Sequence, residues 1–303
     1  MGGKMKYMIG VDGGGTKTEA IAFDQNGKEI ARSMSCFGNV LLDYEKALSH
    51  IMEAIEYCQQ SLSKEDCVCI CLGLAGVKSI DINVLKERLI ARYQTNIEIY
   101  DDAVIAHAAL LGGNDGILTI AGTGAICLGK KGAEYEYSGG WGHILGDEGS
   151  GYWIALQALR RMTIEYDKGE QFCNLSRVIQ KQVPIHTPFD IKQLVYSSQK
   201  DQVAAITPLV IEEARKGNDD AFKIISKASE ELARITVDVY KKMSFEVPIS
   251  IAVKGGILCS VPEIYAEFKR YCENYINEIN FIQSEISSAK GAYFLAVKKS
   301  TLF

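Results

Sequence analysis

The sequence predicts an α/β protein whose two halves share one order of strands and helices. Three observations lead to this prediction. In the first half, apolar runs of strand length alternate with helical patterns in the order βββαβαβα. A turn-rich break, GGNDG at 112–116, follows that series. Beyond the break, the strand, Gly/Thr turn and strand that open the chain return, which indicates an internal duplication.

The composition is typical of a globular protein and argues against two classes of partner. The chain has 303 residues, of which 47% are apolar, and a net charge of -5 with no basic block. The length predicts two domains, which the turn-rich break places at 1–113 and 114–303, with the last helix able to pack back on the first domain. The charge argues against nucleic acid and against an anionic membrane surface.

The nine cysteines predict a reducing cytoplasm rather than a disulfide framework or a zinc site. None belongs to a C-x-x-C pair that is followed by a second such pair or by a histidine group. Cys67, Cys69 and Cys71 alternate with apolar residues, so we expect them buried on one face of a strand. No stretch approaches the ~18 apolar residues of a membrane span, and the N-terminal apolar run is too short for a signal peptide.

The first half opens with three strands. A glycine-rich turn joins the first two, and Asn26-Gly27 is a typical tight turn between the second and the third. The expected elements are strands at 7–11, 19–23 and 29–34, an amphipathic helix at 44–62, and then strand, helix, strand and helix at 67–74, 82–93, 97–100 and 103–111. Because the later strands alternate with helices, we expect them to be parallel, in a mixed sheet covered by helices.

The second half repeats the opening of the chain in GILTIAGTGAICLGKKGAEYEYS, over 116–138. Helical patterns dominate beyond it, most clearly over 222–243. One further strand is expected at 249–253, ending at Gly255-Gly256, with helices from there to the C-terminus. We therefore expect the second half to share the plan of the first half, with additional helices inserted into it.

Two glycine-rich turns at equivalent positions are candidates for binding phosphate. Residues 12–18, DGGGTKT, lead into a strand, so they form neither a Rossmann nor a P-loop motif. Residues 121–124, AGTG, occupy the equivalent turn of the second half. Glycines let backbone N–H groups approach an anion, and threonine hydroxyls add donors. One such turn alone is more typical of a plain hairpin, but the pair predicts a polyphosphate held from both sides of an interdomain cleft.

Asp102 and Asp12 are the carboxylates best placed for phosphoryl transfer. Asp102 follows the strand at 97–100 and begins a helix, so we expect it at the carboxyl edge of a sheet, where it can act as a base. Its structural alternative is to cap the helix, although neighbouring Asp101 is a candidate for that role. Asp12 is suited to hold Mg²⁺ through water, with a turn-stabilising hydrogen bond as the alternative.

These segments resemble the sugar kinase, heat-shock ATPase and actin superfamily, and within it the N-acetylglucosamine kinase and BadF-type ATPase branch. The resemblance rests on the two glycine turns, on Asp102-Ala103 and on Gly255-Gly256, in the order that the family has them. The segment GGWGHILGDEGSGYW, at 139–153, is similar to the sugar-site signature of the N-acetylglucosamine kinases. The resemblance covers nearly the whole chain and implies two actin-like (ribonuclease H-like) domains around an interdomain cleft.

The resemblance also implies an activity, namely ATP-dependent phosphorylation of an amino sugar, with N-acetylglucosamine and its 6-hydroxyl as the leading substrate, and ATP and Mg²⁺ as cofactors. It implies Asp102 as the base and Asp12 as the residue that holds Mg²⁺ through water. The implied nucleotide-binding residues are Gly13, Gly14, Gly15, Thr16, Lys17, Thr18, Gly122, Thr123, Gly124, Gly255 and Gly256. The implied sugar-binding residues are Asn39, Gly140, Trp141, Gly142, Asp147 and Glu148, whereas His143 is expected to be structural.

Three other functions stay open. The first is a BadF-type ATPase that activates a radical dehydratase. The resemblance implies that such activators are dimers that share an iron–sulfur cluster and that they lack the sugar segment. The second is a kinase of glucosamine or N-acetylmuramic acid, because these sugars differ only in their substituents. The third is a non-catalytic sugar sensor, against which Asp102 and the acidic charge argue. The sequence leaves the oligomeric state open, a homodimer included.

Overall fold

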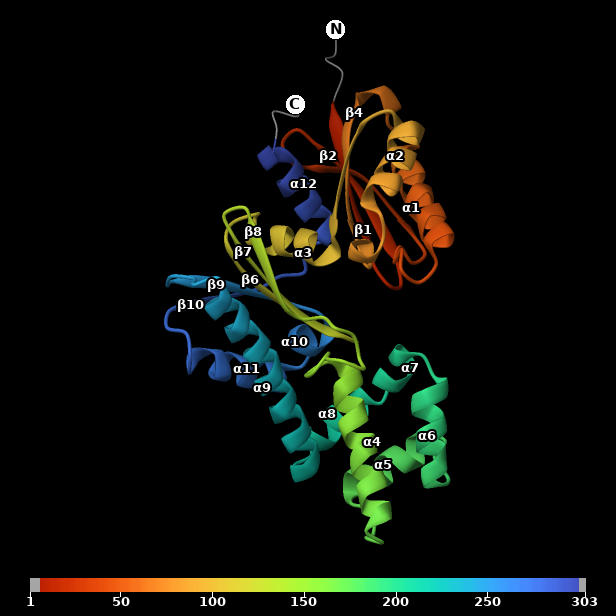
Figure 1. Ribbon diagram of the computed structural model, residues 1–303, viewed down its shortest axis with the longest axis vertical. Helices are drawn as coiled ribbons and strands as arrows, with labels where there is room; N and C mark the ends of the chain where they lie inside the picture. The colour runs from red at the N-terminus through yellow and green to blue at the C-terminus, as the bar shows by residue number, and fades with distance from the viewer. Residues whose placement is uncertain (1–5, 300–303) are drawn as a thin grey trace. The chain divides into compact units, whose positions relative to one another are not determined.

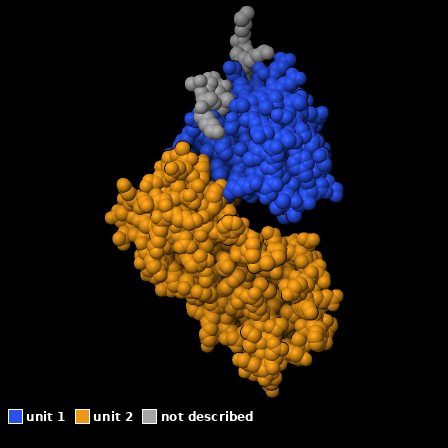
Figure 2. All heavy atoms as spheres, in the orientation of Figure 1, with its two compact units in different colours: residues 1–114, 284–303 blue, residues 115–283 orange. Residues whose placement is uncertain are grey.

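The computed structural model describes residues 6–299, which divide into two compact units (Figures 1 and 2). Unit 1 comprises the residues up to Asn114 and those from Ser284 onward, and unit 2 comprises Asp115–Gln283. The division differs from the ranges expected from the sequence chiefly at the C-terminal segment, which is part of unit 1. No helix among the described residues is long and apolar enough to cross a membrane.

Unit 1 has the order βββαβαβα that the sequence predicts, completed by a C-terminal helix. Its sheet has the strand order β3-β2-β1-β4-β5, in which β1, β4 and β5 are parallel and β2 is antiparallel to both neighbours. The strands are β1 (Tyr7–Gly13), β2 (Thr18–Asp24), β3 (Glu29–Ser35), β4 (Cys67–Leu74) and β5 (Asn96–Asp101). The helices are α1 (Tyr44–Gln59), α2 (Ile82–Tyr93), α3 (Asp102–Leu111) and α12 (Ser288–Lys299), with short 3₁₀ turns η1 (Lys64–Asp66) and η2 (Val77–Ser79).

Helices cover both faces of this sheet. The apolar stripes of α1 and α2 pack on one face, together with Tyr7, Ile9 and Val11 of β1. On the other face, α3 and α12 pack against each other and against β1 and β4 (Figure 1). The approach there is close, since a Cβ on Gly291 of α12 would stand 1.8 Å from the carbonyl oxygen of Ile105 in α3. The chain beyond Ser284 is therefore an integral part of unit 1.

The cysteines of β4 are buried, as the alternating pattern predicts. Cys67, Cys69 and Cys71 all lie in the core of unit 1. Burial raises the pKa of the Cys67 thiol and of the Cys69 thiol to about 12 each, which keeps both neutral. A neutral buried thiol behaves as a small apolar side chain.

Unit 2 repeats the plan and inserts helices after its third strand. Its sheet has the order β10-β9-β6-β7-β8, with β6, β9 and β10 parallel and β7 antiparallel to both neighbours. The strands are β6 (Gly116–Ala121), β7 (Ala125–Lys131), β8 (Glu134–Gly139), β9 (Ile249–Lys254) and β10 (Ile279–Gln283). The helices are α4 (Gly151–Asp167), α5 (Asn174–Gln182), α6 (Pro188–Ser197), α7 (Lys200–Ala204), α8 (Thr207–Arg215), α9 (Asp219–Lys242), α10 (Gly256–Ser260) and α11 (Pro262–Glu273).

Two element predictions are wrong in detail. The first helix ends at Gln59 rather than at residue 62, because Ser61 and Ser63 favour a turn over a helix. The region after Gly256 is not all helical, since β10 pairs in parallel with β9 at the edge of the sheet. Asn280 and Gln283 of β10 are exposed and no residue of the strand is fully buried, so this edge strand lacks the continuous buried apolar run by which strands are found in a sequence.

Candidate functional site

Three parallel strands of unit 1 end together and build its candidate site. Gly13 at the end of β1 is in register with Leu74 of β4, which is in register with Asp101 of β5. Neighbouring strands lie about 4.8 Å apart, so the backbones of Gly13 and Asp101 are about 10 Å apart across the sheet edge. The first glycine turn and the start of α3 therefore lie at the same edge, where the sequence analysis expects Asp102.

Asp101 and Asp102 follow one another at the start of α3. Asp101 is the N-cap of α3 and accepts from the backbone N–H of Ala103 at 3.1 Å. The Lys78 ammonium lies 3.5 Å from its carboxylate. Asp102 is the first helical residue and is half-buried, with its Oδ1 2.9 Å from the same N–H. Both carboxylates thus lie within hydrogen-bonding distance of one N–H, and the N-terminus of α3 favours a negative charge at Asp102.

The first glycine turn is held by backbone bonds and leaves its tip exposed. The Gly14 N–H donates to the carbonyl of Lys17 at 2.9 Å, and Gly15, Thr16 and Lys17 are exposed. Thr18 differs from the expectation that its side chain faces phosphate. It begins β2, is fully buried, and its hydroxyl packs against the neighbouring loop without a hydrogen-bond partner in the described structure. The exposed hydroxyl of the turn belongs to Thr16.

The loop at 36–40 carries Asn39 to the same edge. Its Gly38 N–H donates to the carbonyl of Gly14 at 2.9 Å, which ties the loop to the glycine turn. The Asn39 side chain is half-buried, and its Oδ1 accepts from the Leu41 N–H at 3.0 Å. That bond fixes the amide orientation and leaves the Asn39 NH₂ group to act as a donor.

His50 of α1 supports this loop and was not found from the sequence. Its Nδ1 lies 2.8 Å from the carbonyl oxygen of Phe37, and its ring stands edge-on to the Phe37 ring at 4.8 Å between centroids. Since a carbonyl oxygen only accepts, Nδ1 is the protonated nitrogen. The only sequence signal was a polar residue on the apolar side of an amphipathic helix, which identifies no partner.

Asp12 is the candidate for holding Mg²⁺. It lies in β1 one residue before the end of the strand, half-buried and in register with Gly73 of β4. Within residues 6–299, no three His, Cys, Asp or Glu side chains gather in a group that could hold a metal ion. One carboxylate beside a phosphate-binding turn fits Mg²⁺, which takes its other oxygen ligands from phosphate and water. The donor set does not fit a metal that needs a complete protein cage.

In unit 2, the second glycine turn is joined to the start of α4. The Gly122 N–H donates to the carbonyl of Gly124 at 2.9 Å, closing the turn. The Gly151 N–H donates to the Gly122 carbonyl at 2.8 Å, and the Tyr152 N–H donates to the Thr123 carbonyl at 3.3 Å. The first turn of α4 and residues 122–124 thus form one backbone-bonded assembly.

Asp147 also belongs to this assembly. It is 4% exposed, adopts a left-handed backbone with φ 63°, and its Oδ1 accepts from the Ala125 N–H at 3.3 Å. Its carboxylate packs so close to Gly124 that a Cβ there would stand 2.8 Å from Oδ2. Burial raises the pKa of Asp147 above its ordinary value, and the charges of Lys200 and His143 oppose that rise.

Residues 139–150 carry most of the predicted sugar-binding residues, so we call them the sugar loop. This loop exposes large side chains on a backbone that requires glycine. Gly139, Gly140, Gly142 and Gly149 all have φ between 74° and 83°, a range that side-chain-bearing residues rarely adopt. Trp141 is 74% exposed, and Glu148 is half-buried. His143 is exposed and its ring stands edge-on to the Tyr152 ring, and its structural role stays a prediction.

Gly255 and Gly256 have different roles beside a cavity of unit 2. Gly255 follows β9 with φ 93°, and a Cβ there would stand 2.3 Å from the carbonyl oxygen of Ala121 at the end of β6. Gly256 begins α10 and lines the cavity, which has a volume of about 450 Å³. The other lining residues come from the second glycine turn, the start of α4, the end of α7, α8, α10 and the N-cap of α11, namely Gly122, Thr123, Gly151, Ala204, Thr207, Pro208, Ile211, Ile257, Ser260 and Val261. Its apolar walls beside a glycine turn suit a flat ring with a phosphate tail.

A family model matches residues 9–296 of this chain, and its description is the BadF/BadG/BcrA/BcrD ATPase family. The chain belongs to the BadF/BadG/BcrA/BcrD ATPase family. This BadF-family chain is 30% identical to an N-acetylmuramic acid/N-acetylglucosamine kinase of Clostridium acetobutylicum, over 96% of this chain and 98% of that protein. It is also 30% identical to an N-acetyl-D-glucosamine kinase of Dictyostelium discoideum, again over 96% of this chain and 98% of the relative.

The fold of the BadF-family chain is shared with solved structures. A protein assigned as an N-acetylglucosamine kinase from Chromobacterium violaceum matches with a TM-score of 0.75 over 96% of this chain and 99% of that one. The sequence identity in that match is 21%, so the likeness concerns the fold alone. It confirms the predicted two-domain α/β architecture.

Within each unit, the BadF-family chain brings most of the predicted site residues together. Unit 1 places Asp12, the first glycine turn, Asn39 and Asp102 at one sheet edge. Unit 2 joins the second glycine turn to Asp147 and to the start of α4, and sets Gly256 in the adjoining cavity. The supporting residues His50, Lys78 and Lys200 belong to no motif and are found only from the structure.

Proposed function

We propose that this protein is an ATP-dependent kinase of amino sugars, with N-acetylglucosamine and its 6-hydroxyl as the leading substrate. The observation that carries the proposal is the assembly of unit 2, in which one helix start bonds the second glycine turn while the sugar loop leads directly into it. A phosphate-binding turn and a sugar-binding loop fixed to one helix suit transfer between a nucleotide and a sugar. The two relatives named as kinases of N-acetylated amino sugars support the same substrate class.

The base of the nucleotide is proposed to bind unit 2. Its phosphates are proposed to contact glycine turns of both units. The 450 Å³ cavity beside Gly256 would take the adenosine part, and Gly122 to Gly124 would donate backbone N–H groups to phosphate. In unit 1, exposed Gly15, Thr16 and Lys17 would supply N–H, hydroxyl and ammonium donors to the same phosphates. Bound Mg²⁺, held through water by Asp12, would offset phosphate charge.

Sugar recognition is proposed to use groups from both units. The Asn39 amide, whose oxygen is already occupied by the Leu41 N–H, would donate its NH₂ to a sugar hydroxyl. Trp141, 74% exposed, would offer a ring face to the pyranose. The carboxylates of Asp147 and Glu148 would accept hydroxyl hydrogens, for which the left-handed backbone at Asp147 sets the orientation.

The chemical step is an in-line displacement at the γ-phosphorus. The 6-oxygen forms the new P–O bond, the bond to the ADP oxygen breaks, and the hydroxyl proton passes to the Asp102 carboxylate. Asp102 is suited to this role because it stands at the sheet edge and because Asp101 already caps α3. Positioning and removal of water would supply most of the acceleration.

The proposal is tested by ADP release with N-acetylglucosamine, glucosamine, N-acetylmuramic acid and glucose as acceptors. We expect amino sugars to stimulate ADP release and the Asp102→Asn variant to lose at least about 100-fold in kcat, as is typical on loss of a general base. Asp101→Asn is the matched control, because an asparagine still caps the helix and should retain most of kcat. The proposal fails if no sugar raises ADP release above background, and the assigned base is wrong if the Asp102→Asn variant keeps full activity.

A further inference from the structure

A second cavity of unit 2 adjoins the sugar loop and has no part in the function proposed above. It has a volume of about 690 Å³ and lies between α4 and α6, so we call it the α4–α6 cavity. Its walls are apolar side chains of the two helices, Leu156, Leu159, Ile191 and Val195. His143 and Ile144 of the sugar loop line it, together with Tyr152.

The charged residues of this cavity are all cations. Arg160 of α4 and Lys192 of α6 line it, and no aspartate or glutamate does. Neither cation forms an ion pair with any residue in the described part of the chain. Both cations are exposed, so a ligand from solvent can reach them, and two cations beside apolar walls without a carboxylate suit an anionic ligand with an apolar body.

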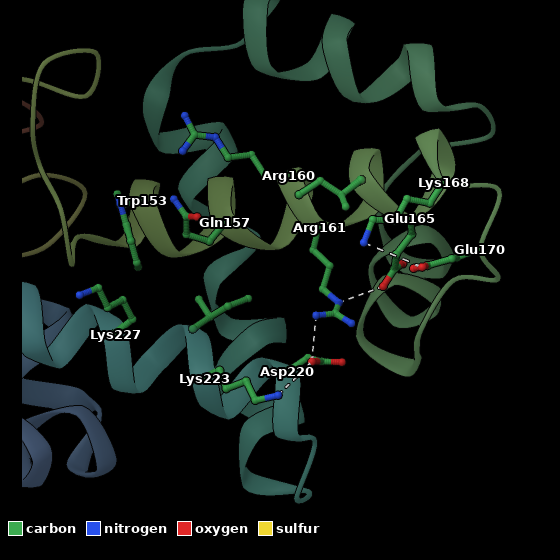
Figure 3. A pocket seen from close by; sticks show the side chains of 12 residues that line it. Trp153, Gln157, Arg160, Arg161, Glu165, Lys168, Glu170, Asp220, Lys223 and Lys227 are labelled. Carbon is green, nitrogen blue, oxygen red and sulfur yellow. Dashed lines mark hydrogen bonds and ion pairs between the residues drawn. The ribbon is translucent and has the colours of Figure 1, made fainter.

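The opposite side of α4 provides the contrast. A groove of about 520 Å³ between α4 and α9 is also rich in cations and is lined by Arg160 as well, but the protein's own carboxylates pair with its other cations. Arg161 lies 2.9 Å from Glu165 and 2.9 Å from Asp220, and Lys227 pairs with carboxylates of its own helix. Figure 3 shows Arg161 directed to Asp220, whereas the Arg160 side chain points away to the other side of α4. Among the described residues, Arg160 is thus the one cation of that groove without a carboxylate partner.

The α4–α6 cavity lies next to the proposed sugar ligand Asp147. His143 lines the cavity, and its charge acts on the Asp147 carboxyl. Ser198 also lines the cavity, and Lys200, two residues further on, acts on the same carboxyl. The end of the cavity formed by the sugar loop is therefore close to the place where the sugar is proposed to bind.

We propose that the α4–α6 cavity is a subsite for the acidic substituent of an amino sugar, with Arg160 and Lys192 binding its carboxylate. This inference rests on the proposed function and narrows it to a substrate such as N-acetylmuramic acid. That sugar is N-acetylglucosamine with a lactyl ether, which adds a methyl group and a carboxylate. The apolar walls suit the methyl group, and the two cations suit the carboxylate.

The test compares three acceptors that differ only in this substituent: N-acetylmuramic acid, its methyl ester and N-acetylglucosamine. For Arg160→Gln and Lys192→Gln, we expect kcat/KM for the acid to fall about 10-fold to 100-fold, which is the range for a lost hydrogen bond to a charged group. The values for the ester and for N-acetylglucosamine should stay within about twofold, and Arg160→Lys should recover part of the loss. Lys168→Gln, which removes a 62% exposed lysine from the end of the same helix, is the matched control.

Several outcomes would overturn the inference while leaving the proposed function intact. One is turnover of N-acetylglucosamine without turnover of the acid. Another is an equal loss on acid and ester, which would indicate a packing effect, and thermal unfolding of each variant identifies such a loss directly. Inhibition of N-acetylglucosamine turnover by free lactate that Arg160→Gln abolishes would assign the cavity to a separate carboxylate. Absence of sugar-stimulated ADP release would instead refute the proposed function itself.

Discussion

The pair Gly255 and Gly256 allows a sharp test of the nucleotide cavity, because adjacent glycines meet opposite surroundings. A Cβ on Gly255 would stand 2.3 Å from the oxygen, 2.6 Å from the carbon and 3.1 Å from the nitrogen of the Ala121 backbone. These atoms belong to the end of β6 and cannot yield as a flexible side chain could. The backbone at Gly255 also has φ 93°, where a side chain is strained. A Cβ on Gly256 would meet nothing within 4 Å.

The expected cost of Gly255→Ala follows from these two terms. Overpacking costs about 1–3 kcal/mol, and a left-handed backbone costs a non-glycine residue about 1–3 kcal/mol. The sum is about 2–6 kcal/mol of unfolding free energy, and at about 2–4 °C per kcal/mol for a domain of this size, unit 2 should melt roughly 5–20 °C lower. Gly256→Ala should shift the melting temperature by no more than about 2 °C.

Differential scanning calorimetry and the KM for ATP together check this reasoning. The Gly256→Ala variant should keep the wild-type melting temperature and raise the KM for ATP, since the added methyl group enters the cavity. The Gly255→Ala variant should instead have a clearly lower melting temperature than the wild type. A Gly255→Ala protein that melts with the wild type would refute the close packing of β6 and β9 at their carboxyl ends, and with it the position of the cavity wall.

Two further predictions concern the sugar-binding residues. The His50→Phe substitution keeps a ring against Phe37 and removes the Nδ1–H donor. We therefore expect a higher KM for sugar, a melting temperature lower by a few degrees and a smaller change in kcat. An unchanged KM would show that the loop at 36–40 holds Asn39 without His50. Burial raises the pKa of Asp147, so the unfolded chain releases its proton at a lower pH than the folded protein, and stability contributed by this group declines as the pH rises through that interval. We therefore expect Asp147→Asn, which retains an acceptor for Ala125, to melt above the wild type at pH 7, with a difference that shrinks toward pH 4, while losing sugar-stimulated turnover; a variant that melts lower at pH 7 would contradict the buried charge.

The spacing of apolar residues and the turn residues were enough to predict the βββαβαβα order of unit 1, because strands buried on both faces give continuous apolar runs. The strand β4, CVCICLGL, is such a run, and its neighbours were placed correctly around it. The edge strand β10 could not be predicted, because an exposed edge imposes no apolar pattern. The inserted helices α5 to α8 were recognised only as a helical region, since their bounds depend on packing against α4 and α9.

The site was predictable where backbone geometry demands a residue type. Four glycines of the sugar loop have positive φ, and a Cβ on Gly13 or Gly124 would meet a close neighbour, whereas Gly15 and Gly122 meet nothing within 4 Å. Side chains were less predictable, since Thr18 looks like a phosphate donor in the motif and is fully buried in β2. His50, Arg160 and Lys192 carry no local signal, because their roles depend on neighbours brought together by the fold.

The hydrogen bonds that join Gly151 and Tyr152 to the second glycine turn have a thermodynamic consequence. Whichever ligand arrives first must immobilise this shared helix start, and the entropy lost then is not lost again by the ligand that follows. Nucleotide and sugar should consequently bind with positive heterotropic cooperativity, and the factor by which each tightens the other must be the same in both directions.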